Sequence, residues 1–318
     1  MVGGGIFAVL GLAVVMAGAG APLSFLLAGG VALLTASSYA TLTGAYPSRG
    51  GTVIFVDRAF GVDVVTGALN TLLWLSYIVT LSLYAVAFAN YAAALAGSDA
   101  GWLWHVLVSV GIVGPAALNL KGAALMSRAE TLVVGVKVTI LVVVGVVGLS
   151  AVQVLRVEPA AWGPLGGVIS AGMLMFVAYE GFELIANAAP DVRTPSRTIP
   201  RAYFASVGFM TALYVLIAVV TVGTLAPADI QGASDFVLAS AGFLVIFAAV
   251  NAAAVVLADE TGGRRWLAGA GVAACLGALG ALVWHTAQTS PGQLARLVGL
   301  IGGAFAVEVV VMAGRNGR

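Results

Sequence analysis

Ten continuous apolar runs of about 20 residues constrain this chain more than any other feature of its sequence. They cover residues 2–20, 23–46, 62–95, 102–120, 131–153, 165–189, 203–224, 238–258, 266–287 and 291–313. A helix of ~20 residues crosses the hydrocarbon core of a bilayer, whereas membrane strands are shorter and alternate apolar with polar residues. Because the runs do not alternate, they predict an all-α, polytopic membrane protein with about ten transmembrane helices.

The charge content excludes the usual soluble classes. Only 8% of residues are charged, against about a quarter in soluble domains. A net charge of +1 gives no reason to expect a nucleic-acid partner. The single cysteine, Cys275, excludes an intramolecular disulfide and a multi-cysteine metal site. Two histidines, His105 and His285, each lie near the end of a run beside a tryptophan, which favours interfacial anchoring over catalysis.

Lysine and arginine residues predict the orientation in the membrane. With a cytoplasmic N-terminus, only Arg156 and Arg296 fall in outside loops, and Lys137 lies inside a run. The other eleven cations fall on the inside: Arg49, Arg58, Lys121, Arg128, Arg193, Arg197, Arg201, Arg264, Arg265, Arg315 and Arg318. Short cytoplasmic loops carry an excess of these residues, so we expect both termini to be cytoplasmic.

The loops between the runs are short. The longest polar stretch, "APDVRTPSRTIPRA", contains Pro190, Pro195 and Pro200, which predict that no helix forms there. The run at 62–95 is long enough to tilt strongly or to include an interfacial piece. We therefore expect no separate soluble domain, and a single membrane domain over residues 1–318.

Four motifs occur in order along the chain. "VGGGIFAVLG" opens the first run, and "SSYATLTGAYPSRGGTVIFVDRAFG" follows the second. "NLKGAALMSRAETLVVGVK" joins the fourth and fifth, and "FVAYEGFELIANAAPDVRTPSRTIPRA" closes the sixth. Together they resemble the amino acid–polyamine–organocation family of permeases, over about residues 1–225. Each motif alone is weak, whereas four in register are specific.

The resemblance implies a five-plus-five inverted-repeat transporter fold in the cell membrane. The first repeat would cover residues 1–153, the second 165–258, and two C-terminal helices 266–313. The implied activity is secondary transport of an amino acid or related amine by alternating access, coupled to protons or to exchange. The resemblance implies no enzymatic reaction and no cofactor. The partners would be the substrate, protons, membrane lipid and, in some members, further copies of the chain.

Glycines in the first and sixth runs are candidates for unwound helix segments. Gly3, Gly4 and Gly5, followed by Ile6, could free backbone N–H groups that bind the carboxylate of a substrate at mid-membrane. The alternative is that they only allow close helix packing. A second break five runs later, at Gly181, is what an inverted repeat predicts, and it favours the binding interpretation.

Two glutamates flank the second glycine, although a buried carboxylate in an apolar run is costly. By resemblance, Glu183 occupies a position where an acid is common and is a candidate for coupling. Glu180 replaces a residue that is more often apolar or small, so it could bear on substrate charge or proton coupling. Alternatively, one glutamate pairs with a basic residue on a neighbouring helix. Phe176 and Tyr179 resemble aromatics that cap the substrate, although a packing role is equally compatible with their positions.

Lys137 lies about 10 Å along the fifth run. It could reach the cytoplasmic interface with its side chain. By resemblance, its ammonium group lies where sodium-coupled relatives of the same fold bind a cation. In proton-coupled members such a lysine ties the fifth span to the unwound first span. We favour this coupling role.

The chain also departs from the family pattern. Only Met1 and Val2 precede the glycines of the first run. Thr41 occupies a position where members of the family often have an acidic residue. Members usually have twelve spans, and residues 238–258 resemble the tenth span more than the eighth. On that interpretation the eighth and ninth spans are missing, the five-plus-five core is incomplete, and transport is weak or absent. The alternative function is a non-transporting membrane scaffold derived from a permease.

Overall fold

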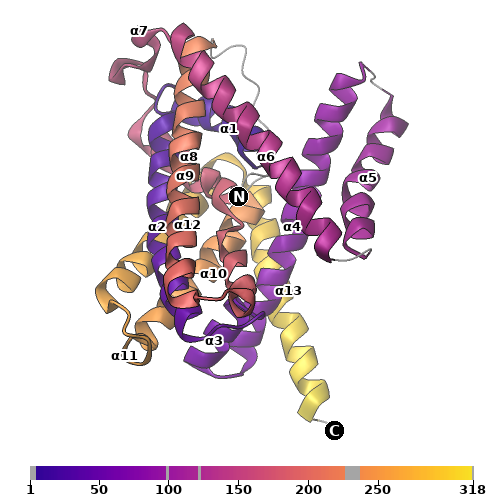
Figure 1. The fold of residues 1–318 in the computed structure, drawn as a ribbon, viewed down its shortest axis with the longest axis vertical. Coiled ribbons are helices and arrows are strands. Elements are labelled where there is room, and N and C mark those ends of the chain that lie inside the picture. Colours follow the sequence, from indigo (N-terminus) through magenta and orange to yellow (C-terminus); the bar gives the residue numbers. More distant parts are fainter. Residues whose placement is uncertain (1–4, 98–99, 121–122, 226–236, 317–318) are drawn as a thin grey trace.

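The computed structural model describes residues 5–97, 100–120, 123–225 and 237–316 of the 318-residue chain (Figure 1). Every regular element in these ranges is helical. The elements are α1 (Gly5–Ala17), α2 (Ala21–Ala45), α3 (Thr52–Phe60), α4 (Val64–Leu95), α5 (Gly101–Leu120), α6 (Ala123–Gly148), η1 (Leu149–Ala151), α7 (Val154–Val157), η2 (Pro159–Ala161), α8 (Leu165–Met175), η3 (Phe176–Tyr179), η4 (Phe182–Asp191), α9 (Pro195–Thr224), α10 (Val237–Val256), α11 (Ala258–Thr261), α12 (Arg265–Thr289) and α13 (Pro291–Asn316).

The predicted all-α, polytopic class is confirmed. Within the described ranges, eight helical segments are long and apolar enough to cross a membrane. Two more of the predicted runs form shorter described helices, α1 in the run at 2–20 and α10 in the run at 238–258. Each of the ten apolar runs therefore corresponds to helical structure.

The third run forms one uninterrupted helix, α4, and does not contain a separate interfacial piece; the short helix α3 lies just before the run. Asp63 caps the start of α4, because its carboxylate accepts from the backbone N–H groups of Val65 at 2.8 Å and Thr66 at 2.9 Å. The Thr66 hydroxyl in turn accepts from the Asp63 N–H at 2.9 Å. This capping box fixes the point where the chain enters α4.

The prediction that prolines keep residues 189–202 free of helix was wrong. Pro190 lies inside η4, Pro195 is the first residue of α9, and Pro200 lies within α9. A proline is tolerated in the first turn of a helix, where its missing N–H would have no helical partner. Helix α9 therefore begins eight residues before the apolar run that predicted it.

The core lies around α2, which contacts α8, α9, α10 and α12. Small residues allow these helices to approach closely: a Cβ atom on Gly29 of α2 would lie within 2.6 Å of the Thr211 side chain on α9. Tyr39 is the centre of an aromatic cluster. Its ring contacts those of Phe55, Phe182, Tyr203 and Phe247 at centroid distances of 5.6–6.0 Å.

A buried polar cluster joins α2, α10 and α12. The Asn251 amide donates to the Thr35 hydroxyl at 2.9 Å and lies 3.6 Å from the Cys275 sulfur, while its oxygen accepts from Ser38 at 2.6 Å. A Cβ on Gly271 would lie 2.4 Å from that amide oxygen, so α12 needs glycine here. Such bonds hold membrane helices together in the absence of a hydrophobic driving force.

The loop between α2 and α3 and the loop between α11 and α12 lie at the end of the molecule where α3 and α11 are seen, opposite to α7 (Figure 1). Arg49 pairs with Asp191 at 3.1 Å, and Arg58 with Glu260 at 3.8 Å. Tyr46 donates to Glu260 at 2.6 Å, and this bond raises the pKa of the Tyr46 hydroxyl above its ordinary value.

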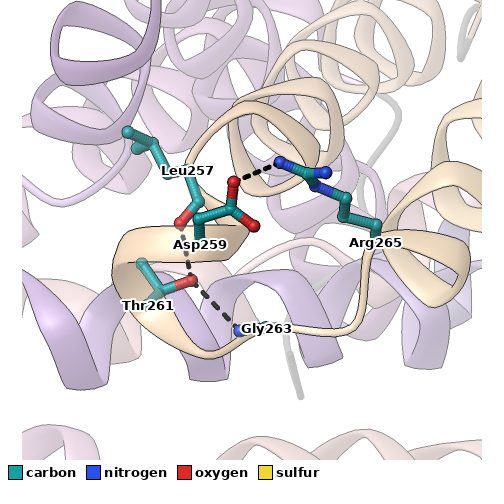
Figure 2. Close-up of polar contacts among 5 residues, drawn as sticks. All are labelled: Leu257, Asp259, Thr261, Gly263 and Arg265. Carbon is teal, nitrogen blue, oxygen red and sulfur yellow. Dashed lines mark hydrogen bonds and ion pairs between the residues drawn. The ribbon is translucent and has the colours of Figure 1, made fainter.

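The turn after α11 is closed by its own side chains (Figure 2). Thr261 donates to the Leu257 carbonyl at 2.9 Å and accepts from the Gly263 N–H at 3.3 Å. Asp259 pairs with Arg265, the first residue of α12, at 2.5 Å. These surface pairs position the loop and contribute little to stability individually.

Candidate functional site

The sixth apolar run is a broken helix. Helix α8 ends at Met175 and continues as the short η3, after which Glu180 is extended, with φ −54° and ψ 147°. Gly181 follows at φ 108°, a left-handed conformation that side chains rarely adopt. The chain then resumes as η4. The break predicted at Gly181 is therefore present.

Side chains from neighbouring helices satisfy carbonyl groups along this broken segment. The Tyr214 hydroxyl on α9 donates to the Ala178 carbonyl at 3.0 Å, and Ser240 on α10 donates to the Leu174 carbonyl at 2.9 Å. At the other end of α8, Ser24 on α2 donates to Val168 at 2.7 Å. Irregular backbone at membrane depth needs such partners, so the break is supported by the surrounding packing.

Both carboxylate oxygens of Glu183 accept hydrogen bonds from the protein. One oxygen accepts from the Gly181 N–H at 2.8 Å and the other from the Tyr77 hydroxyl at 3.0 Å. The side chain is 2% exposed. These bonds tie the turn at the break to α4, which gives Glu183 a structural role. Its role in coupling stays a prediction.

Glu180 is also buried, at 8% exposure, but its environment differs. Its Oε2 atom has no hydrogen-bond partner among the described residues, and the same is true of the Thr80 hydroxyl on α4. Both residues line one cavity. Buried polar groups are nearly always hydrogen-bonded, so these two atoms stand out, although the Thr80 and Glu180 side chains also interact with each other.

This cavity has a volume of about 660 Å³ and is bounded by α4, α5, α6 and the break. Its walls are mainly apolar, and its ionisable groups other than tyrosine are Glu130, Lys137 and Glu180. The full lining is Tyr77, Thr80, Leu81, Tyr84, Pro115, Leu118, Ala129, Glu130, Val133, Val134, Lys137, Glu180, Gly181 and Leu184. An apolar cavity with a few convergent polar groups is typical of a small-molecule site.

Lys137 lines the cavity from α6, with its side chain partly exposed. It makes no hydrogen bond or ion pair with another residue in the described part of the chain. Of the candidates from the sequence, Lys137, Glu180 and Gly181 line this cavity, and their roles in binding and coupling stay predictions.

The first-run candidates lie beside the break. Helix α1 begins at Gly5, where a Cβ atom would lie 3.1 Å from the Cα of Ala178 and 3.6 Å from the Tyr84 hydroxyl. Ile6 is fully buried. Gly3 and Gly4 lie outside the described residues, so their role in binding a carboxylate, and the tie from Lys137 to this segment, stay predictions.

Phe176 and Tyr179 lie in the core and not in the cavity wall. The Phe176 ring contacts Phe247 at 5.5 Å. The Tyr179 hydroxyl donates to the Phe25 carbonyl at 2.7 Å, and its ring contacts Tyr214 at 5.3 Å. The packing alternative accounts for all these contacts, and a contact with substrate stays a prediction for both residues.

Sequence reasoning missed the contribution of α4. Tyr77, Thr80, Leu81 and Tyr84 lie three or four residues apart, which places them on one face of the helix. Polar side chains with this spacing in an apolar run were the signal that could have identified the wall. Glu130 on α6 gave a similar signal, because it lies seven residues, about two helical turns, before Lys137.

Comparison with known proteins identifies the class. A sequence profile described as "Amino acid permease" matches residues 1–291. The chain belongs to this family. The permease is thus a multi-pass membrane protein of a transporter family, as its motifs and apolar helices predicted.

Individual relatives carry transporter names. The permease is 33% identical over 244 residues to the inner membrane transport protein YbaT of Escherichia coli, covering 76% of this chain and 56% of YbaT. It is 34% identical over 256 residues to an uncharacterized protein of Methanocaldococcus jannaschii, covering 77% of this chain and 59% of that protein. The branched-chain amino acid permease BcaP of Bacillus subtilis is 27% identical over 273 residues, covering 76% of this chain and 56% of BcaP. The chain spans little more than half the length of these relatives.

Proposed function

We propose that this permease carries an amino acid or a related amine across the cell membrane by alternating access, driven by protons or by exchange. One observation carries the proposal: the cavity of about 660 Å³ at the helix break is lined by an unpaired buried carboxylate. Broken helices at mid-membrane are where transporters of this type bind their substrates. Family membership and the printed names of the relatives support an amino acid as the cargo.

The orientation proposed from the sequence has support in the fold. Arg58 lies in α3, and Arg49 and Arg264 lie in the loops before α3 and after α11, at the end toward which the C-terminus extends in Figure 1. Arg156 lies in α7 at the opposite end. We assign the cation-rich end to the cytoplasm. The described part of the C-terminal helix α13 then ends on the cytoplasmic side, and we place both termini there.

Uptake into liposomes tests the proposed function. The purified 318-residue chain is reconstituted with an imposed proton gradient, and separately with unlabelled amino acid inside for exchange, against a panel of labelled amino acids. Saturable uptake that Glu180→Gln reduces supports the proposal. Binding of labelled amino acids to the detergent-solubilised protein is measured in parallel. A folded protein that neither binds nor accumulates any member of the panel would favour the non-transporting scaffold.

A further inference from the structure

We propose that a second cavity, at the cation-rich end of α2, binds the phosphate group of an anionic phospholipid whose acyl chain lies along α2 between α9 and α12. This α2 cavity has a volume of about 300 Å³ and shares no lining residue with the cavity at the helix break. Helices α9 and α12 both pack on α2, and each supplies one wall. The turn that precedes α12, which contains Gly263 and is drawn in Figure 2, belongs to the second wall.

The wall residue Arg264 is a cation without a protein partner. It is exposed and makes no ion pair with another described residue. The acids of the neighbouring helix α11 are paired elsewhere, Asp259 with Arg265 and Glu260 with Arg58. None of the described residues that line the cavity is acidic. The planar Arg264 guanidinium is therefore available to an anion, and its fork of N–H donors matches a phosphate.

Two further arginines lie beside the cavity on α9. Pro200 and Phe204 line the cavity, and Arg197 and Arg201 each precede one of them by three residues, which places all four on one side of the helix. Both arginines are exposed, and neither forms an ion pair with a residue in the described ranges. Together with Arg264, they surround the cavity with positive charge from two elements, which favours an anionic ligand.

Aromatic residues place the α2 cavity at the level of the lipid headgroups. Trp266, in the first turn of α12, is 70% exposed, and Phe204 in the cavity wall is 46% exposed. Exposed tryptophans concentrate at membrane–water interfaces. An anion bound to Arg264 therefore lies among headgroups, where phospholipids supply phosphate at a high local concentration. Basic pockets between membrane helices at this level are suited to anionic lipid headgroups.

The surface below the cavity is open to an acyl chain. Gly30 precedes the cavity residue Ser37 by seven residues, or two turns, so both lie on one face of α2. Gly208 lies one turn after Phe204 on α9. A Cβ atom at either glycine would meet no other atom within 4 Å. This open strip leads from the cavity toward the middle of the membrane, beginning beside Phe204 and Leu267, and it suits an apolar chain.

The charges and hydroxyl groups of the cavity select the class of lipid. Phosphatidylcholine and phosphatidylethanolamine carry an ammonium group, for which the described lining offers no carboxylate. Phosphatidylglycerol carries a net negative charge and free hydroxyls instead. The hydroxyls of Ser37 and Thr41 already donate to the carbonyls of Leu34 at 2.7 Å and Ser37 at 2.9 Å, so their oxygens remain as acceptors. A phosphatidylglycerol headgroup matches both the arginines and these acceptors.

Binding of three probes to the purified protein tests the proposal. Native mass spectrometry and the shift in melting temperature are measured with dioleoylphosphatidylglycerol, dioleoylphosphatidylcholine and glycerol 3-phosphate. We expect phosphatidylglycerol to bind about 10- to 100-fold more tightly than phosphatidylcholine. Equal binding of the two lipids would overturn the site. Glycerol 3-phosphate that binds as tightly as phosphatidylglycerol would assign the cavity to a free phosphate and overturn the lipid as its ligand.

Arginine variants assign the binding to this cavity. Arg264→Gln should weaken phosphatidylglycerol binding by about 10-fold, because a charge-assisted hydrogen bond is lost. Arg197→Gln and Arg201→Gln should each weaken it by about 3- to 5-fold. The matched control is Arg128→Gln, an exposed cation on α6 outside the lining, which should change affinity less than twofold. Unchanged binding in the triple variant would refute the arginine site.

A glycine variant tests the path of the acyl chain. Gly30→Leu places a side chain in the open strip, leaves the arginines intact and should weaken phosphatidylglycerol binding by about 10-fold, the equivalent of about two displaced methylenes. Gly269→Leu is the control, because Gly269 also faces open space but lies on the side of α12 away from Arg264. Without lipid, both variants should melt as the parent does. Full phosphatidylglycerol binding by a folded Gly30→Leu would show that the chain does not lie along α2.

Discussion

Replacing Gly181 by alanine should weaken both the helix break and the ligand site beside it. Gly181 has φ 108°, and holding an L-residue in such a region costs about 1–3 kcal/mol. In a chain somewhat smaller than this one, each kcal/mol of lost stability lowers the melting temperature by ~2–4 °C. The variant should therefore melt about 2–10 °C lower. The strain falls on the peptide whose N–H donates to Glu183, so relaxation of the backbone displaces the adjacent Glu180.

The matched control for this experiment is Gly166→Ala. Gly166 lies in α8 with open space where its Cβ would be, and its φ is not positive. Alanine should stabilise the helix there by about 0.5–1 kcal/mol. The assay is the apparent melting temperature in detergent at a fixed heating rate, since membrane proteins often unfold irreversibly. If Gly181→Ala melts no lower than Gly166→Ala and takes up labelled amino acids as well as the parent, the left-handed turn is not what shapes the site.

Three further predictions concern the pairing at the break, the lysine in the cavity and the orientation. Tyr214→Phe leaves the Ala178 carbonyl unpaired and should destabilise the protein by about 1–2 kcal/mol, whereas Ser109→Ala on the exposed α5 should change stability little. Lys137→Ala and Lys137→Arg should both reduce uptake in liposomes, and uptake with unchanged pH dependence in Lys137→Ala would contradict a coupling role. In a chain carrying Cys275→Ser, an impermeant thiol reagent added to whole cells should label Ala96→Cys but not Ser196→Cys, and the reverse pattern would invert the topology.

The sequence predicted the elements well because membrane helices are encoded by length and continuity of apolar residues. The runs at 23–46 and 62–95 correspond to α2 at Ala21–Ala45 and α4 at Val64–Leu95. The prediction failed at the polar stretch before α9, because proline disrupts the interior of a helix but not its first turn. Pro195 therefore marks the start of α9 and not a loop, whereas Pro200, the sixth residue of α9, lies beyond the first turn and is not covered by this rule.

The site was less predictable than the fold. Glu180 is an exceptional residue within an apolar run, whereas Gly181 is identified by its place between two acids, five runs after the first glycines. Thr80 is an ordinary residue in such a run, and only its missing bond to the preceding turn distinguishes it. That property depends on which face of α4 meets the break, which one sequence does not specify. Phe176 and Tyr179 show the converse, because their proximity to the break does not direct their side chains into the cavity.

Glu180 and Glu183, three residues apart, should respond oppositely when each is replaced by leucine. Glu183→Leu removes the acceptor for the Gly181 N–H and the Tyr77 hydroxyl, leaving two buried donors unpaired, and should destabilise the protein by about 2–4 kcal/mol. Glu180→Leu removes a buried oxygen that has no partner in the described ranges, so it should stabilise the ligand-free protein by about 1–2 kcal/mol while reducing the binding of labelled amino acids. Melting temperatures without ligand and binding of the panel of labelled amino acids to the solubilised protein measure the two effects. A loss of stability in Glu180→Leu as large as that in Glu183→Leu would mean that the protein itself satisfies both carboxylates, and the ligand would then have no open acceptor at the break.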